Sequence, residues 1–212
     1  MFTGIITSQA VLKARKEKSN QVQLTFELIG PVFKLKPGES LALDGTCVTV
    51  THFSGRRFWV DLIPETLRST TLGRREAGQR VNVERSLRLG DSVDGHWVTG
   101  HVDGVGAIRK IERRGENFRL HIEAPADIIR LLVEKGSIAV DGISFTVQGI
   151  AKRCFIIGVT PHTYRATTLP LKRVGESVNL ETDLFAKFVK KFIETRKQNT
   201  PLKIKTLQAK GF

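Results

Sequence analysis

The sequence repeats itself once, and this repeat constrains the fold more than any other feature. When the chain is shifted by 97 residues, three blocks align in one register, and 16 of their 30 positions are identical. Unrelated segments of ordinary composition would share about two. A period this long indicates two tandem domains of similar fold rather than a solenoid. The aligned blocks are Ser40–Val50 with Ser137–Val147, Asp61–Leu72 with Gly158–Leu169, and Gly78–Glu84 with Gly175–Glu181.

A fourth pair of blocks marks the front of each half. Phe2–Ile5 aligns with Val98–His101 at a shift of 96, so one residue is gained or lost further along. Residues after 183 have no counterpart in the first half. We therefore expect an N-terminal domain over 1–86, a linker over 87–97, a C-terminal domain over 98–183, a helix over 184–197 and a basic tail over 198–212.

Each half carries the alternation of apolar and polar residues that is typical of half-buried strands. It is clearest over 22–28 and, at the equivalent place, over 118–122. Many short strands within about 90 residues favour a small closed barrel, which has no exposed edge. Short helices are expected over 64–70 and 125–133. Further strands are expected over 41–43, 48–51, 58–63 and 81–83, separated by turns at Pro37-Gly38, Asp44-Gly45 and Ser54-Gly55.

The segment after the second half has the spacing of an amphipathic helix, with Thr182 or Asp183 as its N-cap. Its apolar face either packs on its own barrel or meets copies of itself in an oligomer, and we favour the oligomer. The apolar residues recur at helical spacing and are Phe185, Phe188, Val189, Phe192 and Ile193.

The charge is the unusual feature of the composition. The chain has a net charge of +13, and about half of it lies in the last 26 residues, which hold eight basic residues and one acid. Such a tail can bind nucleic acid or anionic lipid, but no pattern of aromatic and basic residues supports this, and we favour a solvated tail. No nucleic-acid or membrane partner is expected.

Location and redox chemistry follow from simple absences in the sequence. No stretch approaches the roughly 20 apolar residues of a membrane span, and the start lacks the pattern of a signal peptide, so we expect a cytoplasmic protein. Cys47 and Cys154 are too few for a disulfide framework. No Cys/His cluster indicates a metal site, and none is expected.

Two similar domains offer two similar pockets, which suits a reaction between two molecules of one compound. Duplication for size alone is the alternative. At a shift of 97, Cys47 faces Ser144, Asp61 faces Gly158, and Gly4 faces His101. Reactive residues that differ between equivalent pockets would give the pockets different roles. The plainer alternatives are a buried filler role for Cys47 and a strand-end role for His101.

Five motifs carry a family resemblance over about residues 1–195. They are Met1–Ile6, Asn82–Arg85, Gly95-His96 followed by Thr99–His101, Asp141–Val147, and the paired blocks Pro64-Glu-Thr66 and Pro161-His-Thr163. Together they resemble the riboflavin synthase family.

The resemblance implies a fold, a reaction and an assembly. The fold is all-β, with two tandem six-stranded Greek-key barrels followed by a C-terminal helix. The reaction joins two molecules of 6,7-dimethyl-8-ribityllumazine by four-carbon transfer, giving riboflavin and 5-amino-6-(D-ribitylamino)uracil. It uses no cofactor and no metal. Three chains associate through their C-terminal helices, and the active site forms between the N-terminal barrel of one chain and the C-terminal barrel of a neighbour.

The family's site residues carry over position by position. The catalytic candidates are Cys47, His101, Asp141, Ser144 and Asp183. The substrate-binding candidates of the first barrel are Gly4, Ile5, Ile6, Ser40, Cys47, Val48, Thr49, Asp61, Leu62, Ile63, Pro64, Glu65 and Thr66. Those of the second barrel are Gly100, His101, Val102, Lys135, Ser144, Phe145, Thr146, Gly158, Val159, Thr160, Pro161, His162 and Thr163.

The chemistry suggests roles for some of these residues. A methyl group of one lumazine must lose a proton, and His101 is a suitable acid or base because histidine titrates near neutrality. Ser144 and Cys47 are candidate nucleophiles or proton relays. Ile5, Ile6, Val102 and Phe145 are expected to sandwich the flat ring.

One position departs from the family pattern, and it bears on the choice of function. His162 stands where the family has a Glu in its second Pro-Glu-Thr block. The first hypothesis remains the enzyme, and the alternative is a lumazine or flavin carrier of the same fold that does not catalyse. A basic nucleic-acid-binding barrel is a third and weaker hypothesis, since it rests on net charge alone.

Overall fold

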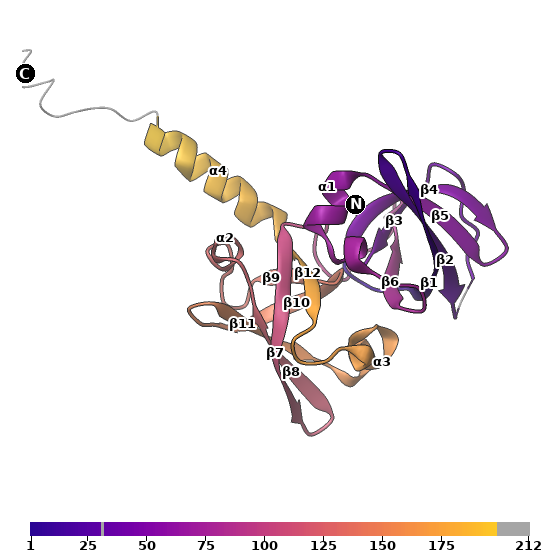
Figure 1. Cartoon of the computed structure of the whole chain (residues 1–212). Helices are drawn as coiled ribbons and strands as arrows, with labels where there is room; N and C mark the ends of the chain where they lie inside the picture. The colour runs from indigo at the N-terminus through magenta and orange to yellow at the C-terminus, as the bar shows by residue number, and fades with distance from the viewer. Residues whose placement is uncertain (31, 199–212) are drawn as a thin grey trace, which may run out of the picture.

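The computed structural model describes residues 1–30 and 32–198 and contains two closed, six-stranded antiparallel barrels followed by a helix. Figure 1 shows the barrels side by side, with the C-terminal helix extending away from both. The all-β class, the two tandem barrels and the helix are thus confirmed. Among the described residues, no helix is long and apolar enough to cross a membrane.

The first barrel closes in the strand order β1-β2-β5-β4-β3-β6. Strand β2 buries every second residue, as its alternating sequence predicts. A short helix and a 3-10 turn fill the connection between β5 and β6. The elements are β1 Ser8–Lys18, β2 Gln21–Ile29, β3 Ser40–Leu43, β4 Thr46–Ser54, β5 Arg57–Leu62, α1 Pro64–Ser69, η1 Thr71–Arg74 and β6 Arg80–Arg85.

The second barrel repeats this topology, with β12 between β7 and β9 as β6 lies between β1 and β3. The helix expected over 125–133 is shorter than predicted. Beyond Ile129 the amides of Leu131 and Leu132 bond three residues back rather than four, so the helix gives way to turns. The elements are β7 Gly104–Arg114, β8 Asn117–Glu123, α2 Ala126–Ile129, β9 Ser137–Val140, β10 Ile143–Ile150, β11 Cys154–Val159, α3 Pro161–Ala166, η2 Leu169–Leu171 and β12 Ser177–Thr182.

Each barrel has its own apolar core, and the two barrels meet at a polar seam between two hairpin turns. Asp44-Gly45 joins β3 to β4, and Asp141-Gly142 joins β9 to β10. All four residues have positive φ, as a two-residue turn of type I′ requires. The turns touch, because a Cβ on Gly45 would lie 2.7 Å from the Gly142 nitrogen. The contact therefore leaves no room for a side chain at Gly45 or Gly142.

Two asparagines cross this seam in opposite directions. The Asn82 side chain donates to the Asp141 carbonyl oxygen at 3.0 Å, and Asn179 donates to that of Asp44 at 2.8 Å. The buried Asp44 carboxylate pairs with Arg75, whereas the Asp141 carboxylate pairs with Lys172. Side chains from both repeats thus bond across the seam and fix one barrel against the other.

Helix α4, Leu184–Gln198, begins at the end of β12 and includes the predicted range 184–197. Asp183 caps it, because the Phe185 amide donates to the Asp183 side chain at 2.8 Å. Its apolar face is open in the single chain, with Phe188 63% and Phe192 64% exposed. Of the expected basic tail over 198–212, only Gln198 lies within the described residues.

Candidate functional site

The front segment of each repeat is anchored to its own barrel by a buried glutamate. The Glu84 carboxylate accepts hydrogen bonds from the Thr3 amide, the Thr3 hydroxyl and the Gly4 amide, at 2.6, 2.7 and 3.0 Å. Glu181 holds Thr99 and Gly100 in the same way, at 2.6, 2.7 and 2.9 Å. Burial raises the pKa of both glutamates.

This geometry corrects one pairing predicted from the sequence. Gly4 and Gly100 are equivalent, since the amide of each donates a hydrogen bond to the glutamate of its own repeat and their φ angles are 80° and 82°. The alignment of Gly4 with His101 is therefore wrong, and His101 corresponds to Ile5. The shift of 96 found for the front blocks applies at this position.

From its anchor, each front segment crosses to the other barrel. The Ser144 amide, on β10, donates to the Gly4 carbonyl oxygen at 2.8 Å. The Cys47 amide, on β4, donates to the Gly100 carbonyl oxygen at the same distance. Phe2 and Val98 form a β-bridge where the two segments pass. Each candidate site is thus composite, with a strand from one barrel and a front segment from the other.

The crossing changes how the predicted ligand residues are grouped. Gly4 and Ile5 lie beside Ser144, and Ile6 packs against the core of the second barrel. The segment Gly100–Val102 starts beside Cys47 of the first barrel. The expected grouping by sequence half is corrected for these two segments.

The Cys47 site has an uncharged thiol near neutral pH. Burial raises the pKa of the Cys47 thiol, and the N-terminal ammonium and then a hydrogen bond with Ser40 oppose this rise. Cys47 is free and half-buried, and Thr49 is exposed two residues further along β4. A protonated thiol in this position can donate a proton, and it is a weaker nucleophile than a thiolate.

The Ser144 site contains a histidine that is not among the predicted site residues. His96 lies in the linker, is 8% exposed, and its Nδ1 is 2.7 Å from the Ser144 hydroxyl. Burial lowers the pKa of His96, against a smaller opposite effect of Asp183. The imidazole is therefore neutral at pH 7 and able to exchange a proton with Ser144. The Gly95-His96 motif was the available signal.

Some predicted ligand residues could offer a ligand only their backbone. Alternation along the strands turns the side chains of Val48, Leu62, Phe145 and Val159 into the barrel cores. Phe145 is 6% exposed, so its ring is not available to sandwich a ligand, and this corrects the role expected of it. Ile5 and Ile63 keep apolar surface exposed, at 43% and 54%.

The two predicted catalytic aspartates make structural contacts within the protein. Asp141 is fully buried in the seam, where it binds Lys172 and the Asn179 amide. Its turn leads directly into β10, the strand that carries Ser144. Asp183 caps α4. Lys135 sits at a φ of 67°, and its amide donates to the Val147 carbonyl oxygen.

The ends of β5 and β11 differ in charge. Asp61 on β5 accepts hydrogen bonds from Lys18, Gln21 and Gln23. Its equivalent on β11 is Gly158, beside a hollow of about 460 Å³. Beyond these positions, Pro64, Glu65 and Thr66 lie on α1, and Pro161, His162 and Thr163 lie on α3, which the Thr160 hydroxyl caps.

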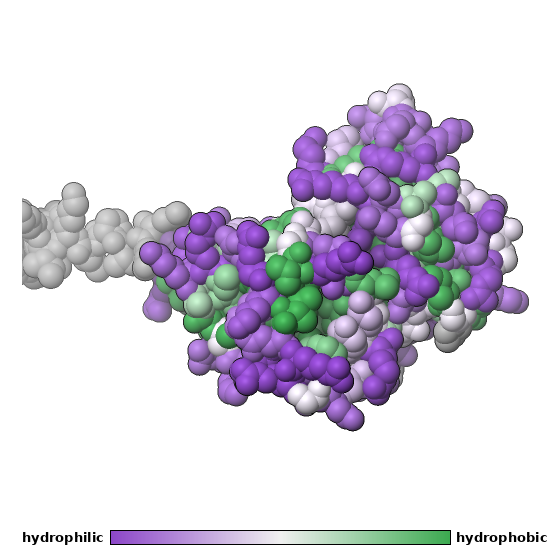
Figure 2. Space-filling model, turned by 60° about the horizontal axis from the view of Figure 1, so that its bottom comes forward, coloured by the Kyte–Doolittle hydropathy of each residue, from purple (hydrophilic) through white to green (hydrophobic). Residues whose placement is uncertain are grey.

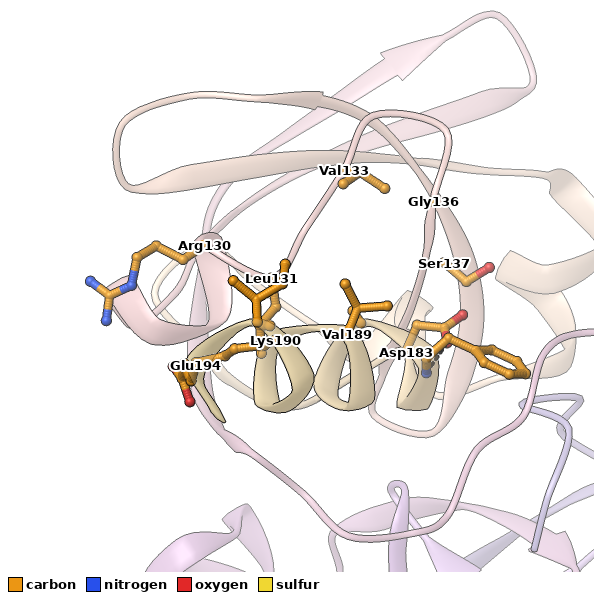
Figure 3. Close-up of a pocket in the computed structure, with 12 residues that line it drawn as sticks. Arg130, Leu131, Val133, Gly136, Ser137, Asp183, Val189, Lys190 and Glu194 are labelled. Carbon is orange, nitrogen blue, oxygen red and sulfur yellow. Dashed lines mark hydrogen bonds and ion pairs between the residues drawn. The ribbon is translucent and has the colours of Figure 1, made fainter. Parts of the chain in front are cut away.

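A larger hollow, of about 700 Å³, lies between α4 and the segment that leads into β9. Figure 3 shows Val189 and Lys190 of α4 on one side, with Leu131 and Val133 on the other. Its lining is mostly apolar, and Figure 2 shows hydrophobic surface near the helix that leads into the grey tail. Within residues 1–30 and 32–198, no group of side chains has the make-up of a metal site.

A family model described as the lumazine binding domain matches this chain twice, over residues 3–86 and 99–183. Curated relatives match nearly the whole chain. A riboflavin synthase of Bacillus amyloliquefaciens is 35% identical over 93% of this chain and 92% of its own length. One of Chlamydia pneumoniae is 39% identical over 88% of this chain and 92% of its own length.

Solved structures share the fold at lower identity. A crystal structure of LumP complexed with riboflavin has a TM-score of 0.78 and 22% identity, and it covers 86% of this chain and 99% of its own. LumP complexed with 6,7-dimethyl-8-(1'-D-ribityl) lumazine and with flavin mononucleotide gives TM-scores of 0.75 and 0.74 at the same identity. At this identity the likeness establishes the fold alone.

Proposed function

The chain belongs to the riboflavin synthase family, and from this membership we propose how its own residues carry out the reaction. It is a transferase of riboflavin biosynthesis that converts two molecules of 6,7-dimethyl-8-ribityllumazine into riboflavin and 5-amino-6-(D-ribitylamino)uracil. The two products contain all the atoms of the two substrates, so the conversion needs no oxidant or reductant. The chain must bind two like molecules in register and move protons between them.

The observation that supports this best is the pair of composite sites with unequal chemistry. Cys47 and Ser144 occupy the same place in the two barrels, and each binds the front segment of the other repeat. One site offers a neutral thiol and the other a hydroxyl bonded to a neutral imidazole. Two identical substrate molecules therefore meet different proton donors and proton acceptors. This difference suits a reaction in which one molecule gives up the four-carbon unit and the other receives it.

For the ring and its side chain we propose a division of labour. Exposed Ile5 and the neighbouring backbone supply apolar surface for the flat ring. The exposed hydroxyls of Thr49 and Thr146 and the strand amides supply hydrogen bonds to its polar edge. Glu65 and His162, exposed on α1 and α3, are placed to bind ribityl hydroxyls.

Proton transfer is assigned to the His96–Ser144 pair. A neutral imidazole whose Nδ1 lacks a proton accepts one through Ser144 from the acidic methyl group of the donor lumazine. The resulting carbanion is delocalised into the ring. The Cys47 thiol and His101 are proposed to return protons at the acceptor lumazine.

We propose that three chains assemble through α4. Its exposed apolar face would bury Phe188 and Phe192 in such an assembly, and the groove beside it would receive apolar side chains of a neighbour. The domain bounds 1–86 and 98–183 and the placement of the active site between the N-terminal barrel of one chain and the C-terminal barrel of another belong to the same proposal.

A non-catalytic carrier is the alternative, because the LumP structures share the fold. It is less well supported, since LumP is 22% identical to this chain whereas curated riboflavin synthases are 33–39% identical. Incubation of the pure protein with the lumazine as sole substrate separates the two. The enzyme forms one riboflavin, followed by its fluorescence, for every two lumazines consumed. Tight binding without turnover would instead establish the carrier.

A further inference from the structure

The two repeats differ at one cluster of four side chains in a way that the proposed reaction does not use. In the first barrel, the Asp61 carboxylate is bound by the Lys18 ammonium at 3.0 Å and by the side-chain amides of Gln21 and Gln23 at 3.2 and 2.9 Å. Three side-chain donors thus converge on one anion, and in the first barrel that anion is the protein's own Asp61 carboxylate.

Strand pairing identifies the same four positions in the second barrel. Asp61 pairs with Gln23 and Lys18 with Gln21, while Gly158 pairs with Arg119 and Arg114 with Asn117. The equivalent donors are therefore Arg114, Asn117 and Arg119. The second barrel therefore has Gly158 in place of the Asp61 carboxylate. It also has a second cation, Arg119, in place of the neutral Gln23.

A hollow lies beside Gly158, and the flexible Gln148 side-chain amide occupies the place where a Cβ at Gly158 would lie. The hollow of about 460 Å³ is lined by both arginines, by Asn117 and Gln148, and by Gly158 and Thr160 at the end of β11. No acidic residue lines it. Glu112 binds Arg114 from outside the hollow, whereas Arg119 has no ion pair within the part of the chain that the structure describes.

We propose that this hollow in the second barrel binds a phosphate group, which takes the place that the Asp61 carboxylate fills in the first barrel. Guanidinium groups suit this ligand because their planar arrays of donors match the oxygens of phosphate. The amides of Asn117 and Gln148 supply neutral donors, as Gln21 and Gln23 do for Asp61. His162, where the first barrel has Glu65, removes a second negative charge from the same end of the barrel.

A phosphate ester on the ligand's side chain fits better than a free phosphate ion. Gly158 and Thr160 belong to the ligand-binding set, so the hollow continues from the proposed ligand site, and in this respect the inference rests on the proposed function. The arginines are exposed, and an exposed charge pair alone binds weakly. A ring bound in the barrel would hold its phosphate at high effective concentration.

The test compares riboflavin with flavin mononucleotide, its phosphate ester, by fluorescence titration of the full chain. The wild type should bind the ester about tenfold more tightly in the second barrel. Arg119→Gln should remove most of that preference and leave the Kd for riboflavin within about twofold. Arg113→Gln removes the same charge from a neighbouring residue that does not line the hollow, and it should preserve the preference.

A second variant restores the first barrel's arrangement. Gly158→Asp places a carboxylate among the arginines and should abolish the preference for the ester, whereas Gly158→Ser adds bulk without charge and should reduce it less. The flexible Gln148 side chain must move in both. Competition by inorganic phosphate at millimolar concentration would identify a free ion as the ligand.

Equal wild-type affinity for riboflavin and its ester, with no competition by phosphate, would overturn the inference. The same holds if Arg113→Gln and Arg119→Gln have equal effects. Riboflavin formation from the lumazine by the wild type is measured separately and tests the proposed function alone.

Discussion

The backbone amide of Ser144 donates a hydrogen bond of 2.8 Å to the carbonyl oxygen of Gly4, although the two residues belong to different barrels. Cys47 and Gly100 repeat this contact on the other side of the seam. The segment that opens each repeat therefore completes the candidate site of the other repeat. A substitution in one half is expected to affect both candidate sites.

Substitution of the two front glycines tests this crossing. Gly4→Ala places a methyl group 2.6 Å from the Ser144 Cβ at a φ of 80°, and Gly100→Ala places one 2.5 Å from the Cys47 Cβ. Each should cost about 1–3 kcal/mol of unfolding free energy. Ligand titration should show that Gly100→Ala weakens the first-barrel site more than the second. Gly38→Ala, at positive φ in open space, is the control for backbone strain alone.

The His96–Ser144 pair should act as a unit. Ser144→Ala and His96→Gln should each lower kcat by about 10²–10⁴, the usual contribution of a general acid or base. The double variant should lose little more than either single one. If the fold-losses in kcat of the two single variants multiplied in the double variant, this would argue against proton transfer through the hydrogen bond between His96 and Ser144. Circular dichroism of each variant controls for folding.

The Cys47 thiol should react slowly with iodoacetamide at neutral pH. Burial raises its pKa, so the thiolate becomes abundant only at a higher pH than for an ordinary cysteine. Ser40→Ala removes the hydrogen bond that opposes this rise, and it should move the pH profile of alkylation higher still. A profile that moves lower would contradict the assigned contact. Cys154→Ser removes the competing thiol.

Asp44 should make the stability of the protein depend on pH. Burial, followed by the neighbouring Asp141, raises the pKa of Asp44 to about 6, against the opposing effects of Arg75 and Lys172. The folded state then holds this proton more tightly than the unfolded state, so the contribution is complete below about pH 4 and is lost as the pH rises through about 6.

The magnitude follows from the size of the shift and is on the order of 2–3 kcal/mol. Urea unfolding between pH 4 and 7.5 measures it. Asp44→Asn keeps a residue that tolerates positive φ before Gly45, and it should flatten this part of the pH profile. The exposed Asp94→Asn serves as a control and should not. An unchanged slope in Asp44→Asn would refute the assignment.

The open face of α4 should control assembly. Phe188→Ser with Phe192→Ser removes two exposed phenyl rings and should convert trimers to monomers in sedimentation velocity, with a large loss of activity. Lys191→Ser, on the polar face, should leave the trimer intact. Fully active monomers would show instead that each chain carries a complete active site.

The barrels were predictable because their signals are local or repeated. Period-two alternation at Val22–Leu28 and the repeated Asp-Gly turns indicate paired strands without knowledge of distant contacts. The internal repeat then requires the same fold twice. The amphipathic spacing from Phe185 onward likewise indicated α4 directly.

Contacts between the repeats were not predictable, since they depend on how two domains pack. No spacing of residues in the sequence indicates that Gly4 contacts Ser144 or that Asp141 is buried beside Lys172. His96 was missed as a candidate because its motif, Gly95-His96, does not indicate that the imidazole reaches Ser144 on β10. The helix over 125–133 was overestimated because apolar residues that enter the barrel core resemble a helical face.

The crossed front segments also bear on the ancestry of the chain. A single ancestral half would have found the partner for its leading segment only in a second identical copy. The exchange is thus the geometry expected of a homodimer whose single gene was duplicated and fused in tandem. In that homodimer one codon specified both reactive positions, so Cys47 and Ser144 could diverge only after the gene was duplicated.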